Sequence, residues 1–350
     1  MSEARQLISA RFGPSERAYL RLSAEQERTR AEVLAKLGDG RYRVAPRPCQ
    51  LCGGADFLVV AERDRYSLPV RTVLCRGCGL LMTNPVMREV DYADFYQHHY
   101  TTLYDGFQFP VDEFFENQQA AGKRLHDTIK QHVELRDKVV AEVGCAAGGI
   151  LHYLQAYSKR VTGCDYGTAF LRKGLASGLN LKVGGIETLR AEKPDVVLYS
   201  HVLEHVFDIG TELGRVHGML PEKGLLIVDV PGIFNIEQAY AADYLRYLQN
   251  AHLFQFTART LSTLMARHGF REVHVDERCI GIYEKAAPGS VAHAIDDEEP
   301  RRILAFLHRI EGRYLLYRLK GLPRKWLVGA LKALGIHGAV RAAYRKLFRT

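Results

Sequence analysis

The stretch KVVAEVGCAAGGI at residues 138–150 decides the fold. It reads as a buried strand ending near the acid Glu142, a turn of small residues, and the start of a helix. Small residues in the turn let a ligand approach the backbone, and the following helix N-terminus offers free N–H groups. The pattern predicts a nucleotide-type pocket, although a plain strand–turn–helix connection has the same form.

The segments that follow continue the alternation of strand and helix patterns. Strands are predicted at KVVAEV, RVTGCD, LKV, DVVLYS, GLLIVDV, REVHVDE and CIGIYEK, and helices at ILHYLQAY, TAFLRKGLASG, TELGRVHGML and ARTLSTLMARHG. Such alternation implies an α/β fold with a mostly parallel sheet covered by helices on both faces.

The acid Asp165 ends the strand RVTGCD, one strand after the small-residue turn. At this spacing a carboxylate can take both ribose hydroxyls of a nucleoside. The alternative is that Asp165 caps the following helix. A dehydrogenase is the main competitor for the pocket, but Cys145-Ala146-Ala147 follows Gly144 where a dinucleotide fingerprint needs room for a pyrophosphate.

Five motifs together resemble the class I S-adenosylmethionine (SAM)-dependent methyltransferases over about 138–285: EVGCAAGGIL, VTGCDYG, DVVLYSHVLEHVFD, GLLIVDVPG and HLFQFTARTLSTLMARHGF. The resemblance implies a Rossmann-like, seven-stranded sheet and SAM as the methyl donor. It places the methionine end of SAM at Glu142, Gly144, Ala146 and Gly148, with Ala146 in place of the family's middle glycine.

The same resemblance assigns the rest of the donor. The remaining contacts fall on Asp165 and Tyr166 for the ribose, Ile186 and Glu187 for the adenine, and Ser200 and His201 near the sulfonium.

Four of the seven cysteines form two CxxC pairs, Cys49/Cys52 and Cys75/Cys78, separated by 22 residues. Four thiolates at this spacing suit tetrahedral Zn²⁺, and the glycines beside each pair suit tight turns. With no open coordination position, the zinc is expected to be structural. The alternative is a redox dithiol, which two matched pairs argue against.

A zinc ribbon ahead of such a core resembles a bacterial group of methyltransferases common in sugar and surface-polysaccharide pathways. It resembles more distantly the sugar C-methyltransferases, which carry a further domain after the core. The resemblance implies methyl transfer to a hydroxyl of a sugar, in a nucleotide sugar or a cell-surface glycan. The alternatives are sugar C-methylation, RNA or protein methylation using the ribbon and tail, and a scaffold without turnover, against which the intact Glu142, Gly144 and Asp165 argue.

Methyl transfer to a hydroxyl or an enolisable carbon usually needs a base near the acceptor. We predict His252 as this base, because QNAHLFQF resembles the EH-x-x-YF stretch of the sugar C-methyltransferases. His205 is the second candidate, although it and Glu204 could simply brace the loop. A structural role is equally open for His252. His98, His99 and Tyr100 form a candidate lid over the donor, or plain packing.

The charge is divided unevenly. Residues 301–350 carry 13 Lys and Arg against one acid, whereas the preceding 300 residues carry 35 basic and 39 acidic groups. The tail is expected to form basic amphipathic helices, which could lie on an anionic membrane, pack on the body or, less favourably, bind nucleic acid.

No apolar run long enough to span a membrane and no signal peptide is recognised, so we expect a cytoplasmic protein, peripheral on the inner membrane face if the tail binds lipid. The predicted divisions are N-terminal helices at 1–45, a zinc ribbon at 46–84, a helical lid or connector at 85–134, the SAM-binding core at 135–287, a linker at 288–300 and basic helices at 301–350.

Overall fold

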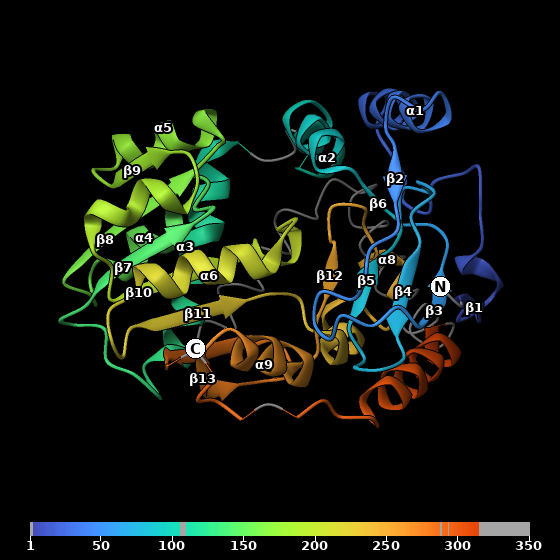
Figure 1. Ribbon diagram of the computed structural model, residues 1–350. Coiled ribbons are helices and arrows are strands. Elements are labelled where there is room, and N and C mark those ends of the chain that lie inside the picture. Colours follow the sequence, from blue (N-terminus) through green and yellow to red (C-terminus); the bar gives the residue numbers. More distant parts are fainter. Residues whose placement is uncertain (1–2, 106–109, 288, 293, 315–350) are drawn as a thin grey trace, which may run out of the picture.

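The computed structural model describes residues 3–105, 110–287, 289–292 and 294–314. Two sheets lie side by side in it, a larger one built by the central part of the chain and a smaller one built mainly by the N-terminal part (Figure 1).

The larger sheet contains every strand predicted after residue 138. Its strands are β7 (Val139–Val143), β8 (Arg160–Asp165), β9 (Asn180–Val183), β10 (Val196–Ser200), β11 (Leu225–Asp229), β13 (Phe270–Val275) and β14 (Ile280–Lys285). They lie in the order β13-β14-β11-β10-β7-β8-β9, and the neighbouring pairs from β11 to β9 are parallel. Strand β14 runs antiparallel to both β11 and β13. All the parallel strands therefore present their carboxyl ends at one edge of the sheet.

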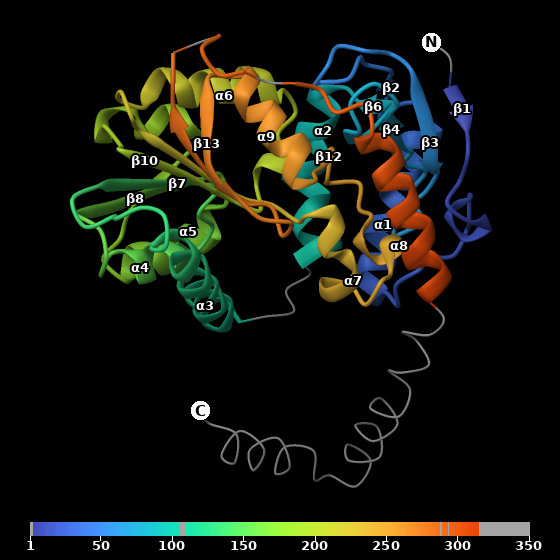
Figure 2. The same ribbon diagram turned by 90° about the horizontal axis from the view of Figure 1, so that it is seen from below.

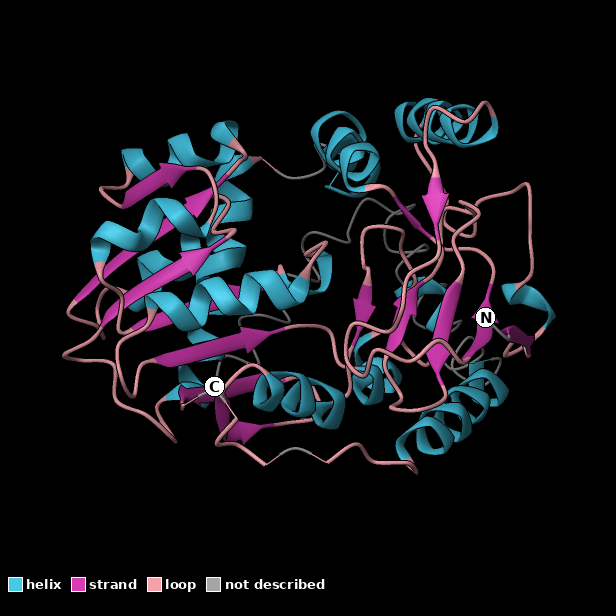
Figure 3. Ribbon diagram, in the orientation of Figure 1, coloured by secondary structure: helices cyan, strands magenta, loops and turns pink. Residues whose placement is uncertain are grey.

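Helices cover both faces of this sheet (Figures 2 and 3). One face carries α3 (Val111–Ile129), α4 (Gly149–Leu154) and α5 (Thr168–Ala176), and the other carries α6 (Ile209–Met219) and α9 (Ala258–Arg267). Successive side chains of a strand point to opposite faces of the sheet. Because helices cover both faces, the central strands are buried on both sides and need continuous apolar runs. In β10, Val196 and Leu198 pack in the cluster with α3 and α4, whereas Val197 and Tyr199 pack in the opposite cluster.

The smaller sheet draws its strands from distant parts of the chain. Its strands are β1 (Glu3–Arg5), β3 (Phe57–Ala61), β4 (Thr72–Cys75), β5 (Leu81–Thr83) and β12 (Phe254–Gln255), in the order β1-β3-β4-β5-β12. The strand β12 lies inside the predicted 135–287 core, yet it pairs antiparallel with β5. The predicted core segment thus supplies an edge strand to the other sheet.

Helices were predicted for residues 1–45, but the structure contains strands there as well as a helix. Residues of β1 form a strand parallel to β3, and β2 (Val44–Ala45) pairs with β6 (Val86–Met87). The predicted helix is present as α1 (Ala24–Gly38), where Ser23 and Gln26 form a reciprocal capping box. Three residues are too few for a sequence pattern to reveal a strand such as β1, which depends on pairing with β3.

The segment between the two sheets contains α2 (Glu89–Phe95), which continues into a π-helix (Tyr96–Asp105). After β11, the short helices α7 (Ile236–Ala239) and α8 (Tyr244–Tyr247) lead to β12. Tyr92 and Phe95 of α2 are buried in the cluster that includes residues of both sheets, whereas Tyr244 and Tyr247 of α8 pack with the smaller sheet.

A helix at residues 299–314 packs against the smaller sheet, so the predicted linker ends two residues earlier than expected. Its apolar face, formed by Ile303, Leu307 and Ile310, is buried in one cluster with Leu58 and Val60 of β3. The first part of the basic tail therefore packs on the body. The membrane and nucleic-acid predictions for 315–350 concern residues outside those described. Among the described residues, no helix is long and apolar enough to cross a membrane.

Candidate functional site

The small-residue turn after β7 is held in a conformation that needs its glycines. Gly144 and Gly148 have φ of +70° and +76°, and Ala146 has φ of +46°. A Cβ atom on Gly144 would lie 2.4 Å from a methyl group of Val202, so a side chain at Gly144 would collide with the turn after β10. Ala146 tolerates the left-handed region at some cost, and its amide donates a hydrogen bond to Asp165 Oδ2 at 2.9 Å.

Glu142 is buried at the end of β7, with 1% of its surface exposed. Its Oε2 atom has no hydrogen-bond partner among the described residues. Burial, and then the charge of Asp165, raise the pKa of Glu142 to about 8. A buried carboxyl oxygen without a partner beside this turn suits a ligand that carries a positive charge.

Asp165 lies at the end of β8 with both carboxylate oxygens engaged by backbone amides. Oδ2 accepts from Ala146, and Oδ1 accepts from Gly167 at 2.6 Å. Each oxygen retains a second lone pair, so ribose hydroxyls can still be accepted. The bond to Gly167, just ahead of α5, also gives Asp165 part of the capping role that was the alternative prediction.

The other predicted donor residues are distributed around this turn. Tyr166 is 75% exposed, Ile186 is buried, and Glu187 Oε1 accepts from the amide of Gly185 at 3.0 Å. Ser200 Oγ donates to Asp229 Oδ2 at 3.3 Å. Their roles toward a donor stay predictions.

His201, Glu204, His205 and His252 converge beyond the end of β10. The Glu204 Oε1 atom lies 3.6 Å from His201 Nδ1, 3.7 Å from His205 Nε2 and 3.8 Å from His252 Nε2. Glu204 is 1% exposed, and neither of its carboxylate oxygens has a hydrogen-bond partner within 3.5 Å. We refer to these four residues as the Glu204 cluster.

The pKa values of the three histidines of the Glu204 cluster shift in different directions. Desolvation opposes the charged form of His201, although 62% of its side chain is accessible. The carboxylates of Glu204 and Asp229 outweigh this effect and raise the pKa of His201 to about 9. Burial lowers the pKa of His205 despite the Glu204 charge. Burial, and then His205, lower the pKa of His252 well below its usual value.

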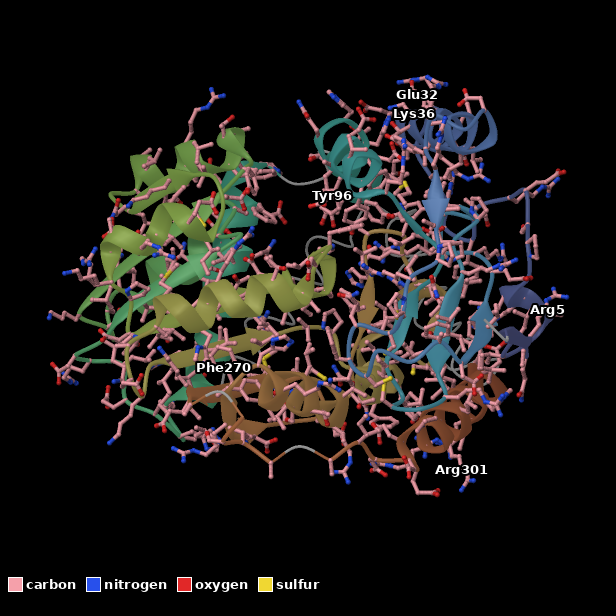
Figure 4. The ribbon with its side chains drawn as sticks, in the orientation of Figure 1. Arg5, Glu32, Lys36, Tyr96, Phe270 and Arg301 are labelled. Atoms are coloured by element: carbon pink, nitrogen blue, oxygen red, sulfur yellow. The ribbon has the colours of Figure 1, made fainter. Side chains whose placement is uncertain are left out.

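Side chains that the sequence did not single out hold the cluster in place. His205 Nδ1 lies 2.6 Å from the Tyr96 hydroxyl and 2.9 Å from the Ala251 carbonyl oxygen. Asp64 Oδ2 accepts from the amide of Asn250, which fixes the loop before His252. Tyr96 lies below α2, between the two sheets (Figure 4). Tyr96 lies in the aromatic-rich stretch DYADFYQHHYTTLY at residues 91–104, which is the sequence signal that could have pointed to it.

The predicted lid of His98, His99 and Tyr100 is only partly placed at the site. Tyr100 stacks on Tyr96 with ring centroids 4.6 Å apart and meets His205 edge-on. The nearest carboxylates to His98 and His99 are instead Asp94 and Glu32, on α2 and α1. The π-helix turns these two side chains toward the helices rather than toward the turn at residues 144–148, the predicted donor site, which we call the donor turn.

The comparison with protein families matches the part of the chain that carries both the donor turn and the Glu204 cluster. Residues 114–275 match the model of a methyltransferase domain. The chain is a transferase, and this segment is its methyltransferase domain. The prediction of an enzyme of this class is therefore confirmed. No protein of curated function matches the chain by sequence.

Solved structures of methyltransferases are similar to part of the chain. The Burkholderia thailandensis 1,6-didemethyltoxoflavin-N1-methyltransferase is 18% identical, with a TM-score of 0.41, and the match covers 59% of this chain and 96% of that one. A SAM-dependent methyltransferase from Mesorhizobium loti is 15% identical, with a TM-score of 0.37, and the match covers 45% of this chain and 94% of that one. Human N-acetylserotonin methyltransferase is 14% identical, with a TM-score of 0.42, over 56% and 62%.

The four cysteines ahead of the methyltransferase domain come together at one end of the smaller sheet. Cys49 Sγ lies 3.5 Å from Cys78 Sγ, and Cys52 Sγ lies 3.4 Å from Cys75 Sγ. All four sulfur atoms lie within 4.8 Å of one another, and none forms a disulfide. Zinc–sulfur bonds of about 2.3 Å in a tetrahedron place the sulfurs about 3.8 Å apart, so the group fits a zinc ion.

Proposed function

We propose that the methyltransferase domain transfers a methyl group from SAM to a hydroxyl of a sugar, either in a nucleotide sugar or in a cell-surface glycan. The observation that carries this proposal is the contact between Gly144 and Val202. The donor turn lies against the segment 201–205, which carries most of the Glu204 cluster. This proximity supports a reaction between donor and acceptor at the carboxyl ends of β7 and β10.

The donor half of the proposal rests on the groups around the turn after β7. When bound, SAM supplies a methyl group on a positively charged sulfur. The buried carboxyl group of Glu142 suits the positive charge of its methionine end, and the free lone pairs of Asp165 suit the ribose hydroxyls. The left-handed backbone at Gly144 and Gly148, where a Cβ atom would collide with Val202 and with Leu179, fixes the shape of this turn.

The acceptor half rests on the Glu204 cluster. A buried carboxylate without hydrogen-bond partners and imidazole nitrogens around it can accept the hydrogen of an incoming hydroxyl group. In this arrangement the predicted residues His252 and His205 take part in deprotonating the hydroxyl, and the protein mainly aligns its oxygen with the methyl group. A hydroxyl-rich acceptor gives this cluster more partners than an isolated enolisable carbon does.

An acceptor screen with methyl-labelled SAM tests the proposal. We expect label in nucleotide sugars or glycan fragments, with mass spectrometry showing a methyl ether rather than a C-methyl group. The Glu204→Gln variant should lose most of this transfer, while Glu222→Gln, at an 89% exposed position, should retain it.

Binding of S-adenosylhomocysteine, measured by calorimetry, tests the donor half separately. Absence of binding would overturn the donor assignment. Label that enters only RNA or protein, or only a sugar carbon, would overturn the sugar hydroxyl and favour the corresponding alternative.

A further inference from the structure

We propose that Glu204, His205 and His252 bind a divalent first-row metal cation, separate from the ion expected at the four cysteines. Their ligand atoms lie within 4.8 Å of one another. Two imidazoles and one carboxylate form a ligand set that Zn²⁺, Fe²⁺ and Mn²⁺ accept in proteins, with further positions left open.

The spacing of the three side chains matches a site that closes slightly around an ion. Ligand bonds of about 2.0–2.2 Å place neighbouring donor atoms about 3 Å apart. The observed separations from Glu204 Oε1 are 3.7 Å to His205 Nε2 and 3.8 Å to His252 Nε2. Movements of less than about 1 Å would therefore bring all three donor atoms to one ion.

The hydrogen bonds of His205 show which of its nitrogens faces Glu204 with a lone pair. The carbonyl oxygen of Ala251 can only accept, so His205 Nδ1, 2.9 Å away, carries the hydrogen. In the neutral ring, Nε2 then presents a lone pair to the Glu204 carboxylate. Two electron-rich atoms facing each other in a buried space need a positive species between them.

A hydrogen bond from the far nitrogen to a carbonyl is also the usual support of a metal-binding histidine. The Tyr96 hydroxyl, 2.6 Å from the same Nδ1, adds a second support. A simple brace would instead be expected to join these side chains directly. Both oxygens of Glu204 lack such a bond to any described residue, and so does His252 Nδ1.

His252 needs one rearrangement to serve as a ligand. The side-chain amide of Gln249 contacts His252 Nε2, the nitrogen that faces Glu204. The other end of this amide, Gln249 Oε1, accepts from Arg65 at 2.7 Å, so the side chain must turn its nitrogen away from His252 Nε2 before that atom can bind an ion. The loop itself stays fixed through the hydrogen bond from Asn250 to Asp64.

The open coordination positions indicate what the ion does. His201 is the exposed member of the Glu204 cluster, and the adjoining Val202 touches the donor turn at Gly144. Resting on the proposed function, we infer that a hydroxyl oxygen of the acceptor completes the coordination. A bound cation would lower the pKa of the coordinated hydroxyl group, and the proton would leave to solvent water.

Metal counting on the full chain tests the site without any methyl acceptor. After chelator treatment and gel filtration, titration with Zn²⁺ should load two ions per chain in the unmodified protein. The Glu204→Gln and His252→Asn variants should load one. The controls Glu222→Gln and His308→Asn change exposed side chains and should load two. Tyr96→Phe should keep two ions but weaken the second by roughly tenfold.

A second probe covers a preference for a harder ion. With the cysteines filled by zinc, Mn²⁺ binding followed by electron paramagnetic resonance should show one ion per chain, lost in Glu204→Gln. Failure to bind both a second Zn²⁺ and Mn²⁺ would overturn the site, as would binding that neither substitution changes. Retained binding of S-adenosylhomocysteine in each variant shows that the domain is folded, and its failure in the unmodified chain would count against the proposed donor rather than the metal site.

Discussion

The carboxylate of Asp165 accepts a hydrogen bond from the amide of Ala146, 2.9 Å away, so the acid that ends β8 holds the turn that follows β7. This bond ties together the two parts of the proposed donor site and holds a non-glycine residue in the left-handed region.

We therefore expect Asp165→Ala to weaken S-adenosylhomocysteine binding by about 10- to 150-fold, since hydrogen bonds to a charged group contribute about 1.5–3 kcal/mol. Asp165→Asn keeps one acceptor oxygen and should lose less. Calorimetry provides the measurement, with Asp137→Ala as the control because Asp137 is exposed outside the site. Equal affinity in Asp165→Ala and the unmodified chain would contradict the assignment.

Glu142 should make donor binding and stability depend on pH. With its pKa raised to about 8, the folded chain keeps a proton near pH 7 that the unfolded chain has released. Stability should therefore fall as pH rises from about 5 to 8, with a slope approaching one proton, because the folded state binds more protons in that range. Unfolding by urea across this range should show the slope, and Glu142→Gln should flatten it.

Binding of the donor should release that proton, because the positive methionine end favours the Glu142 carboxylate. Calorimetry at pH 7 in buffers of different ionisation heats should show proton release approaching one per SAM bound. Glu142→Gln should show none. The same heat in every buffer for the unmodified chain would contradict this role.

Loss of metal from the four cysteines should destabilise the smaller sheet. Cys52→Ser is expected to lower the zinc content by about one ion and to reduce stability by several kcal/mol, because structural zinc contributes directly to folding. Metal analysis and thermal unfolding would measure both effects. Cys279→Ala, at a buried cysteine outside the set, should keep its zinc. Unchanged zinc in Cys52→Ser would argue against the site.

The helix at 299–314 should contribute to the stability of the whole chain. Leu307 is fully buried against the smaller sheet, so Leu307→Ala should cost about 2–5 kcal/mol. Arg301→Ala, at an exposed position of the same helix, should change stability by less than about 0.5 kcal/mol. Urea unfolding measures the change in stability of each variant. A change in Leu307→Ala as small as that in Arg301→Ala would show that the helix does not contribute.

The sequence predicted the elements of the larger sheet well, because short strand-type runs alternate with helical patterns between turn residues. RVTGCD, for example, coincides with β8 (Arg160–Asp165). The four cysteines were also predictable, because the spacing of two CxxC pairs restricts their geometry. The prediction was poorer where pairing rather than pattern determines structure, as in β1 and β12.

The Glu204 cluster shows the same limit at the level of the site. His205 and His252 were singled out separately, but their convergence on one Glu204 oxygen depends on the path of the chain after β11. Glu204 itself was predicted only as a brace, because its burial without hydrogen-bond partners is a property of the folded chain. Tyr96 reaches His205 only because α2 lies between the sheets.

The strands of the smaller sheet lie far apart in the sequence, and this limits the order in which the chain can fold during synthesis. Its first strand contains Glu3–Arg5, but its last strand is Phe254–Gln255, and the helix that covers it begins at residue 299. Contacts so far apart in sequence form slowly. In a nascent chain the smaller sheet must therefore remain incomplete until most of the methyltransferase domain has been translated. The four cysteines beside this sheet are synthesised well before that point.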